Sequence, residues 1–211
     1  MTLLLSDPRV RAVPVLENDE PLVALPHALS PHGCAVRLGV AQRLDIAQRL
    51  LPQGVSLLVR EGHRTVSDQR AIITEYTAEV CAARPGVGPA ELARLVSRFV
   101  APIDVAGHVS GSAVDLTLCD EQGRELDLGC PIDATPEQSG GRCFTASPAV
   151  RGTARRNRDL LSATLEEAGL VNYPTEWWHW SWGDRYWALS TGADAAVHGP
   201  VELREPHQDV A

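Results

Sequence analysis

The chain has 211 residues, a formal net charge of −8 and 44% hydrophobic residues. This length predicts a single domain spanning residues 1–211, and the apolar content suffices for a hydrophobic core without disulfides or a structural metal. The acidic balance argues against nucleic acid as a partner, because phosphate binding needs a basic surface.

The five cysteines are odd in number and loosely spaced, and they form no C-x-x-C pair. This pattern disfavours a disulfide framework and is typical of reduced thiols in a cytoplasm. The N-terminal apolar run, Leu3-Leu4-Leu5, is too short for a secretory signal, and no stretch approaches the roughly 20 apolar residues that span a bilayer. We therefore expect a cytoplasmic protein that does not associate with a membrane.

The first 36 residues are rich in proline and predict an irregular wrap with short strands at Val13–Leu16 and Val23–Leu25. Apolar residues at helical spacing then predict a helix over Leu38–Leu51, followed by a buried strand over Val55–Val59. Arg64 comes soon after that strand, where the chain enters a loop, and this is a common position for functional side chains.

Two helices are predicted next. Thr65 or Ser67 can cap a long helix that runs to about Ala83. Pro89 suits the first position of a second helix, which continues to about Val100. A connection then leads into the next strand.

The segment Ser112–Leu118 alternates in the way a strand does. One set of side chains (Val114, Leu116 and Leu118) is expected to face the core. The other set includes Asp115, which is expected to project into a cleft.

The remainder of the chain is assigned from turn residues and periodicity. The expected elements are a hairpin at Asp120–Gly129, a long loop at Cys130–Ala149, a helix at Thr153–Ala168, strands at Val171–Ser181 and Tyr186–Leu189, and a loosely held tail after Gly192.

His108, Asp115 and His179 form a candidate metal site, because two imidazoles and one carboxylate leave a zinc position open for water. His108 and Asp115 are seven residues apart, so a turn at Gly111 is required to bring them together. Glu176 precedes His179 by three residues, and the bend implied by Pro174 and its neighbours can turn Glu176 back toward the metal.

Glu176 is the candidate general base, and Arg64 is the candidate group for stabilising an oxyanion. Each residue also has a simpler interpretation: Asp115 held by backbone amides, His179 as a core residue of an aromatic strand, and Arg64 in a surface ion pair. The other histidines have no supporting pattern and are interpreted as ordinary loop residues: His27, His32, His63, His198 and His207.

Taken together, the motifs resemble the zinc D-alanyl-D-alanine dipeptidases, the enzyme type associated with vancomycin resistance. The resemblance runs in order from about residue 40 to 189. It is carried by Gly62-His-Arg64, Gly111-Ser-Ala-Val-Asp115-Leu-Thr-Leu118, Leu128-Gly129-x-x-x-Asp133, Asn157-Arg-x-Leu160 and Glu176-Trp-Trp-His179.

The resemblance implies an α+β fold with a central antiparallel sheet flanked by helices, shared with D,D-carboxypeptidases and Hedgehog-type domains. It implies one zinc ion and a small dipeptide substrate, with the oligomeric state left open. The residue roles it implies are zinc ligands His108, Asp115 and His179, catalytic base Glu176, transition-state stabiliser Arg64, and Asp133 as a contact for the substrate ammonium group.

Two positions depart from the family pattern. Ala106-Gly107 stands where the family usually has serine before the first ligand, and His63 and Thr65 flank Arg64 in place of tyrosine and proline. These changes leave the metal site intact and bear on substrate-carboxylate contacts and side-chain preference. Two alternatives therefore stay open: a D,D-carboxypeptidase acting on longer cell-wall peptides, and a zinc-binding domain without catalysis.

Overall fold

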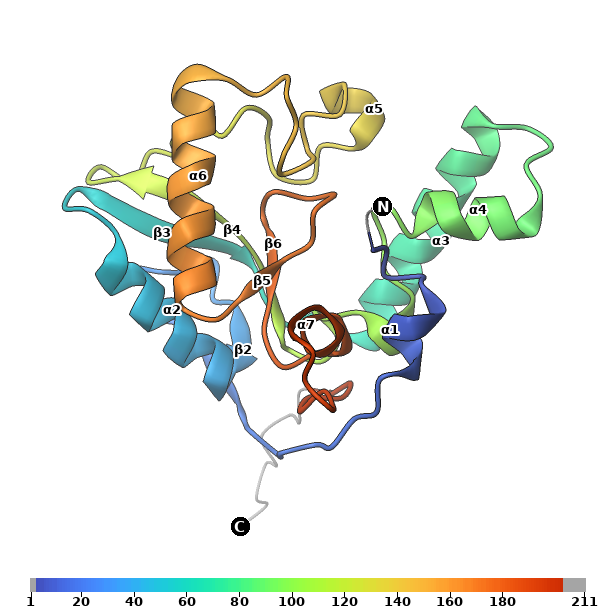
Figure 1. Cartoon of the computed structure of the whole chain (residues 1–211), viewed down its shortest axis with the longest axis horizontal. Coiled ribbons are helices and arrows are strands. Elements are labelled where there is room, and N and C mark those ends of the chain that lie inside the picture. Colours follow the sequence, from blue (N-terminus) through green and yellow to red (C-terminus); the bar gives the residue numbers. More distant parts are fainter. Residues whose placement is uncertain (1–2, 203–211) are drawn as a thin grey trace, which may run out of the picture.

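A four-stranded antiparallel sheet forms the centre of the molecule (Figure 1). Its strands are, in spatial order, β3 (Val55–Glu61), β4 (Ala113–Asp120), β6 (His179–Ser181) and β5 (Val171–Asn172). The computed structural model describes residues 3–202. The predicted α+β fold, with a central antiparallel sheet flanked by helices, is confirmed. The elements in chain order are α1 (Pro8–Ala12), β1 (Leu22–Ala24), β2 (Ala35–Arg37), α2 (Leu38–Leu50), β3 (Val55–Glu61), α3 (Val66–Ala83), α4 (Pro89–Val96), the 3-10 turn η1 (Ile103–Val105), β4 (Ala113–Asp120), α5 (Pro136–Ser139), α6 (Gly152–Glu167), β5 (Val171–Asn172), β6 (His179–Ser181) and α7 (Arg185–Thr191).

Helices α2 and α6 lie together on one side of the sheet, and α3 and α4 lie on the other (Figure 1). The main hydrophobic core includes Leu44 of α2, Leu161 and Leu165 of α6, and the inward side chains of the strands. Val114, Leu116 and Leu118 belong to this core, as their alternation in the sequence predicts. Asp115 therefore points to the opposite face of β4, away from α2 and α6.

The strand register brings polar side chains from three strands into one row. Asp115 of β4 pairs with His179 of β6, and it also pairs with Glu61 at the end of β3. A register shift between Val59 and Glu61 interrupts the β3 ladder just before this row. Cross-strand neighbours have Cβ atoms about 5 Å apart, so the register alone makes these side chains neighbours.

The turn required before β4 is present and is centred on Gly111, whose φ is +69°. The amide of Gly111 donates to the carbonyl of His108 at 3.0 Å, and the carbonyl of Gly111 accepts from the amide of Arg37 at 2.8 Å. The chain thus reverses between His108 and Asp115, which places the two side chains on the same face of the sheet.

Several predictions near the C-terminus are wrong. The predicted strand Tyr186–Leu189 is helix α7, because the Asp184 side chain caps it by accepting from the amide of Trp187. The predicted strand Val171–Ser181 is divided into β5 and β6 by a turn. Residues 193–202 are not a loose tail: Ala196 and His198 are buried, whereas residues 203–211 lie outside the described part of the chain.

The N-terminal wrap also contains structure that the sequence analysis missed. Helix α1 precedes the predicted strand Val13–Leu16, which is reduced to an isolated bridge between Val15 and Ala196. The α4 helix ends at Val96 rather than Val100, and the long loop after β4 contains the short helix α5. Within residues 3–202, no helix combines the length and apolar character that crossing a membrane requires.

The Gly111 turn predicts a specific loss of stability. A Cβ added at Gly111 would lie 2.4 Å from Leu22 Cδ2, whereas one added at Gly123, which has a similar φ of +74°, meets nothing within 4 Å. Gly123→Ala should cost about 1 kcal/mol for the backbone conformation alone, and Gly111→Ala about 2 kcal/mol because the end of the Leu22 side chain must also move aside. Urea unfolding measures both, and equal losses would show that the turn is not closely packed.

Candidate functional site

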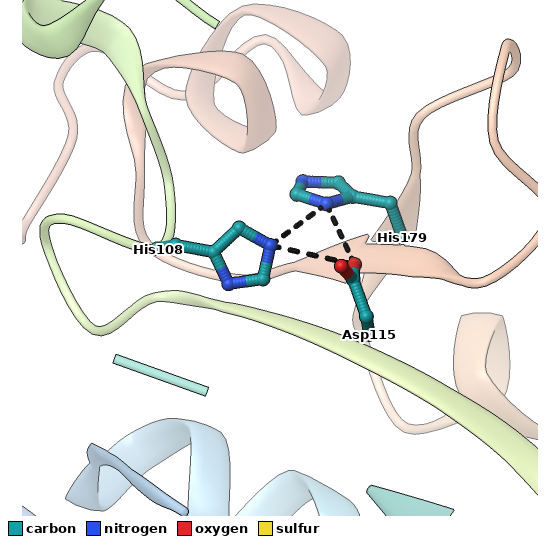
Figure 2. A group of neighbouring side chains, drawn as sticks. All are labelled: His108, Asp115 and His179. Atoms are coloured by element: carbon teal, nitrogen blue, oxygen red, sulfur yellow. Dashed lines mark hydrogen bonds and ion pairs between the residues drawn. The ribbon is translucent and has the colours of Figure 1, made fainter. Parts of the chain in front are cut away.

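His108, Asp115 and His179 converge on one point, with ligand atoms from all three within 4.8 Å of one another (Figure 2). His108 Nε2 lies 3.2 Å from His179 Nδ1 and 3.4 Å from Asp115 Oδ1, and His179 Nδ1 lies 3.0 Å from the same oxygen. The three residues come from the turn before β4, from β4 and from β6. The structure therefore brings together the three residues that the sequence analysis selected as ligands.

These separations fit a zinc ion. Ligand atoms about 2.0–2.1 Å from a tetrahedral metal lie roughly 3.3 Å from one another, which is close to the three observed distances. Nitrogen and carboxylate oxygen donors are also the types that zinc prefers. All three residues are buried, with 5% of His108, 4% of Asp115 and 8% of His179 exposed.

The charges within the triad favour an ionised aspartate. Burial by itself would raise the pKa of Asp115, but the neighbouring imidazoles of His108 and His179 hold that pKa well below its usual range. Burial by itself would lower the pKa of His108, and the Asp115 carboxylate reverses this and raises it. A buried anion is therefore placed where a cation is expected, which is the electrostatic requirement of a metal site.

A contact outside the triad sets the orientation of the His108 ring. His108 Nδ1 lies 2.8 Å from the carbonyl oxygen of Gly62. Because a carbonyl only accepts, Nδ1 carries the proton and Nε2 is left free to bind a metal. Gly62 also packs closely against β2, since a Cβ there would lie 2.5 Å from the carbonyl oxygen of Ala35.

Glu176 lies beside the triad without belonging to it. The turn between β5 and β6, in which the Glu176 amide donates to the carbonyl of Tyr173 at 2.9 Å, brings the carboxylate back toward His179. Its Oε2 is 3.9 Å from His179 Nδ1, and its buried Oε1 has no hydrogen-bond partner among residues 3–202. Burial and the nearby Asp115 raise the pKa of Glu176 well above its usual value.

Arg64 is held in place by two neighbours. Its Nε donates to Glu61 Oε1 at 2.7 Å, its Nη2 pairs with Glu61 Oε2, and its Nη1 donates to Gln69 Oε1 at 2.7 Å. Burial by itself would lower the pKa of Arg64, but the Glu61 carboxylate raises it above the usual value. The guanidinium is therefore a fixed cation that lines the same cavity as the triad.

The sequence analysis missed Gln69 and Glu61. Gln69 is 1% exposed, and its Nε2 donates to the carbonyl of Ala101 at 2.8 Å, so it ties Arg64 to the segment after α4. A signal was present, because Gln69 precedes Ile72, Ile73 and Tyr76 on the apolar side of α3. A polar residue on such a stripe is buried and must find partners.

The triad, Glu176 and Arg64 face one cavity of about 280 Å³. Asp133 lines this cavity while keeping an exposed outer side, and it adopts a left-handed backbone with a φ of +62°. Burial of its inner side and the negative charge of Asp115 raise the pKa of Asp133 to about 6. The structure thus gathers all six residues selected from the sequence around one small space.

His198 is not the ordinary loop residue that the sequence suggested. It is 2% exposed, its Nδ1 lies 2.9 Å from Ser112 Oγ, and its Nε2 lies 3.3 Å from Glu20 Oε2. His63 is also anchored, with Nε2 2.7 Å from the carbonyl oxygen of Val201. These contacts join residues 196–202 to the segments beside the site. His207 lies outside the described residues.

Comparison with known proteins identifies the family and the fold. A family model described as D-ala-D-ala dipeptidase matches residues 36–195. A D-alanyl-D-alanine dipeptidase from Synechocystis sp. is 28% identical over 217 residues, covering 84% of this chain and 87% of that protein. One from Escherichia coli is 40% identical over 83 residues, covering 39% of this chain and 41% of that protein. The solved structure of VanYB in complex with D-alanine-D-alanine shares the fold, with a TM-score of 0.50 and 18% identity over 88% of this chain and 94% of that chain.

The donor set predicts how zinc binding responds to mutation. His179→Ala should lower zinc affinity by more than about 100-fold, because removing a direct ligand should cost at least as much as losing an outer-shell partner. The exposed His27 provides a matched control, and His27→Ala should leave the affinity unchanged. Calorimetric titration of the metal-free proteins with zinc measures both. Equal affinities for the two variants would contradict a metal site at the triad.

Proposed function

We propose that this chain, which belongs to the D-alanyl-D-alanine dipeptidase family and is a peptidase of that family, uses zinc to hydrolyse D-alanyl-D-alanine or a closely related small dipeptide. One observation carries the proposal: three buried donors converge at 3.0–3.4 Å while the carboxylate of Glu176 stays free beside them. A purely structural zinc site would be closed by a fourth ligand and would need no adjacent free base.

Zinc held by His108, Asp115 and His179 would lower the pKa of a water molecule to about 7 and polarise the scissile carbonyl. Glu176 would take the proton of the attacking water and deliver it to the leaving amine. Its raised pKa suits both steps, because a carboxylate with a pKa closer to neutrality can accept a proton and then donate it.

Arg64 would stabilise the oxyanion that forms as the carbonyl is attacked. Its hydrogen bonds to Glu61 and Gln69 hold the guanidinium before the substrate arrives, so little reorganisation is needed during the reaction. The remaining N–H groups of Arg64 are left for the substrate, since a guanidinium carries five donors.

Asp133 would bind the ammonium group of the substrate through its carboxylate. A binding group at the edge of a cavity of about 280 Å³ favours a short peptide with a free amino end. This arrangement supports a dipeptidase over a D,D-carboxypeptidase, whose substrates extend beyond the amino side of the cleaved pair.

The substrate class is tested by comparing a panel of free D,D-, L,D- and L,L-dipeptides with an N-acylated tripeptide that ends in D-alanyl-D-alanine. We expect turnover of free D,D-dipeptides and little turnover of the acylated peptide. Preference for the acylated peptide would identify a D,D-carboxypeptidase. Zinc binding without any turnover would identify a non-catalytic domain.

The role of Glu176 predicts a separation of binding from catalysis. Glu176→Gln keeps the shape of the side chain and removes its ability to accept a proton, so kcat should fall by about 100-fold or more. Zinc affinity should stay within a few-fold of the wild type, because Glu176 is not one of the three ligands. Glu166→Gln, on the exposed side of α6, is the matched control and should keep full activity. An active Glu176→Gln enzyme would reject the proposed base.

The raised pKa of Asp133 predicts that kcat/KM depends on pH. Only the ionised carboxylate attracts an ammonium group, so kcat/KM should fall as the pH drops through about 6 and Asp133 becomes protonated. Asp133→Asn should have a higher KM at neutral pH and should lack the part of the pH dependence centred near 6. Steady-state kinetics between pH 5 and pH 8 checks this, and identical profiles for the two proteins would remove Asp133 from substrate binding.

A further inference from the structure

A second and larger hollow lies next to the catalytic cavity. It has a volume of about 680 Å³, compared with about 280 Å³ for the cavity that contains the triad. Its lining comes from the N-terminal segment, the end of α4, the loop around Phe144 and the turn before Glu176. The hollow is open and carries none of the metal-ligating residues.

Three chain segments separate the two spaces, and each contributes neighbouring residues to opposite sides. Leu5 lines the catalytic cavity, whereas Leu4 and Ser6 line the outer hollow. In the second segment, Phe99 lines the catalytic cavity and Arg98 lines the outer hollow. In the third, Glu176 lines the catalytic cavity and Thr175 lines the outer hollow. The partition is thus about one residue thick at each of these segments.

Two of the three segments are built into the fold. Glu176 belongs to the turn between β5 and β6, and Phe99 packs against Tyr76 of α3 with ring centroids 5.1 Å apart. The amides of Phe99 and Val100 both donate to the carbonyl of Val96, so the chain there continues from the end of α4.

The N-terminal segment, residues 4–6, belongs to no helix or strand and is held by a few contacts to distant parts of the chain. The amide of Leu5 lies 3.4 Å from the hydroxyl oxygen of Tyr173, and Ser6 Oγ lies 2.6 Å from Ser97 Oγ. The Leu5 side chain is 6% exposed and packs in a small cluster with Val105 and Tyr186. Its neighbour Leu4 is only partly buried.

We propose that Leu5 is a specificity-determining residue whose side chain closes the catalytic cavity and limits one substrate residue to a small side chain. Shortening Leu5 enlarges the catalytic cavity at this wall and creates space for a larger side chain. The Leu5 side chain is apolar and can neither transfer a proton nor stabilise a charge, so its effect is on size selection. The inference rests on the proposed dipeptidase activity.

The test compares Leu5→Ala with Leu4→Ala, which makes the same change one residue away on the outer side of the partition. The substrates are D-alanyl-D-alanine, D-phenylalanyl-D-alanine and D-alanyl-D-phenylalanine, which keep both charged ends and differ in the residue that is large. We expect Leu5→Ala to raise kcat/KM for one of the phenylalanine dipeptides, relative to D-alanyl-D-alanine, by at least about tenfold. The phenylalanine dipeptide whose relative kcat/KM rises identifies which of the two substrate residues lies against Leu5. Leu4→Ala should keep the wild-type ratio of kcat/KM values.

Binding provides a second measurement that does not depend on turnover. In a Glu176→Gln background, calorimetric titration should show at least about tenfold tighter binding of the same phenylalanine dipeptide when Leu5 is shortened. If Leu5→Ala fails to fold, Leu5→Val is used in its place. Leu5→Met, which nearly conserves the volume, should keep the wild-type selectivity.

The outcomes separate this inference from the proposed function. If the wild type hydrolyses none of the dipeptides, the proposed function fails. If the wild type hydrolyses D-alanyl-D-alanine but a folded Leu5 variant keeps the wild-type ratio and affinity, Leu5 does not set the size limit. An equal gain from Leu4→Ala would also overturn the inference, because it would show a general loosening of the N-terminal segment.

Discussion

The interaction on which the rest of the site depends is the burial of the Asp115 carboxylate between two imidazoles. A buried anion costs several kcal/mol unless it is paired or bound to a metal. His108 and His179 hold it in ionised form, with the nearer imidazole nitrogen 3.0 Å from its oxygen. The antiparallel register of β4 and β6 and the turn at Gly111 keep these groups at that separation.

The groups that would do chemistry are held by the same elements that hold the ligands. Gly62 orients His108 through its carbonyl, and two residues further along the chain Arg64 is fixed by Glu61 and Gln69. One short stretch at the end of β3 therefore sets both a metal ligand and the cation that faces the substrate. This arrangement is the kind of preorganisation that lets fixed charges stabilise a transition state at little cost.

Much of this site could be predicted from the sequence because its requirements are local. The alternation around Asp115, the glycine at position 111 and the bend before Glu176 each specify a backbone conformation that nearby residues impose. The failures have a different cause. The segment Tyr186–Leu189 has strand-like composition, but the Asp184 cap makes it a helix, and the burial of His198 follows from contacts with Ser112 and Glu20, which are distant in sequence.

The sequence by itself determined most of the main elements and the residues from which a zinc site could be built, because periodicity, turn residues and donor type are properties of short segments. The fold class followed from the family resemblance that the ordered motifs carry. The tertiary structure decided how the ligands meet, which residues hold Arg64, and that Leu5 from the N-terminal segment lines the cavity. Those contacts join residues far apart in the chain, and no local pattern encodes a distance between segments that approach one another only through folding.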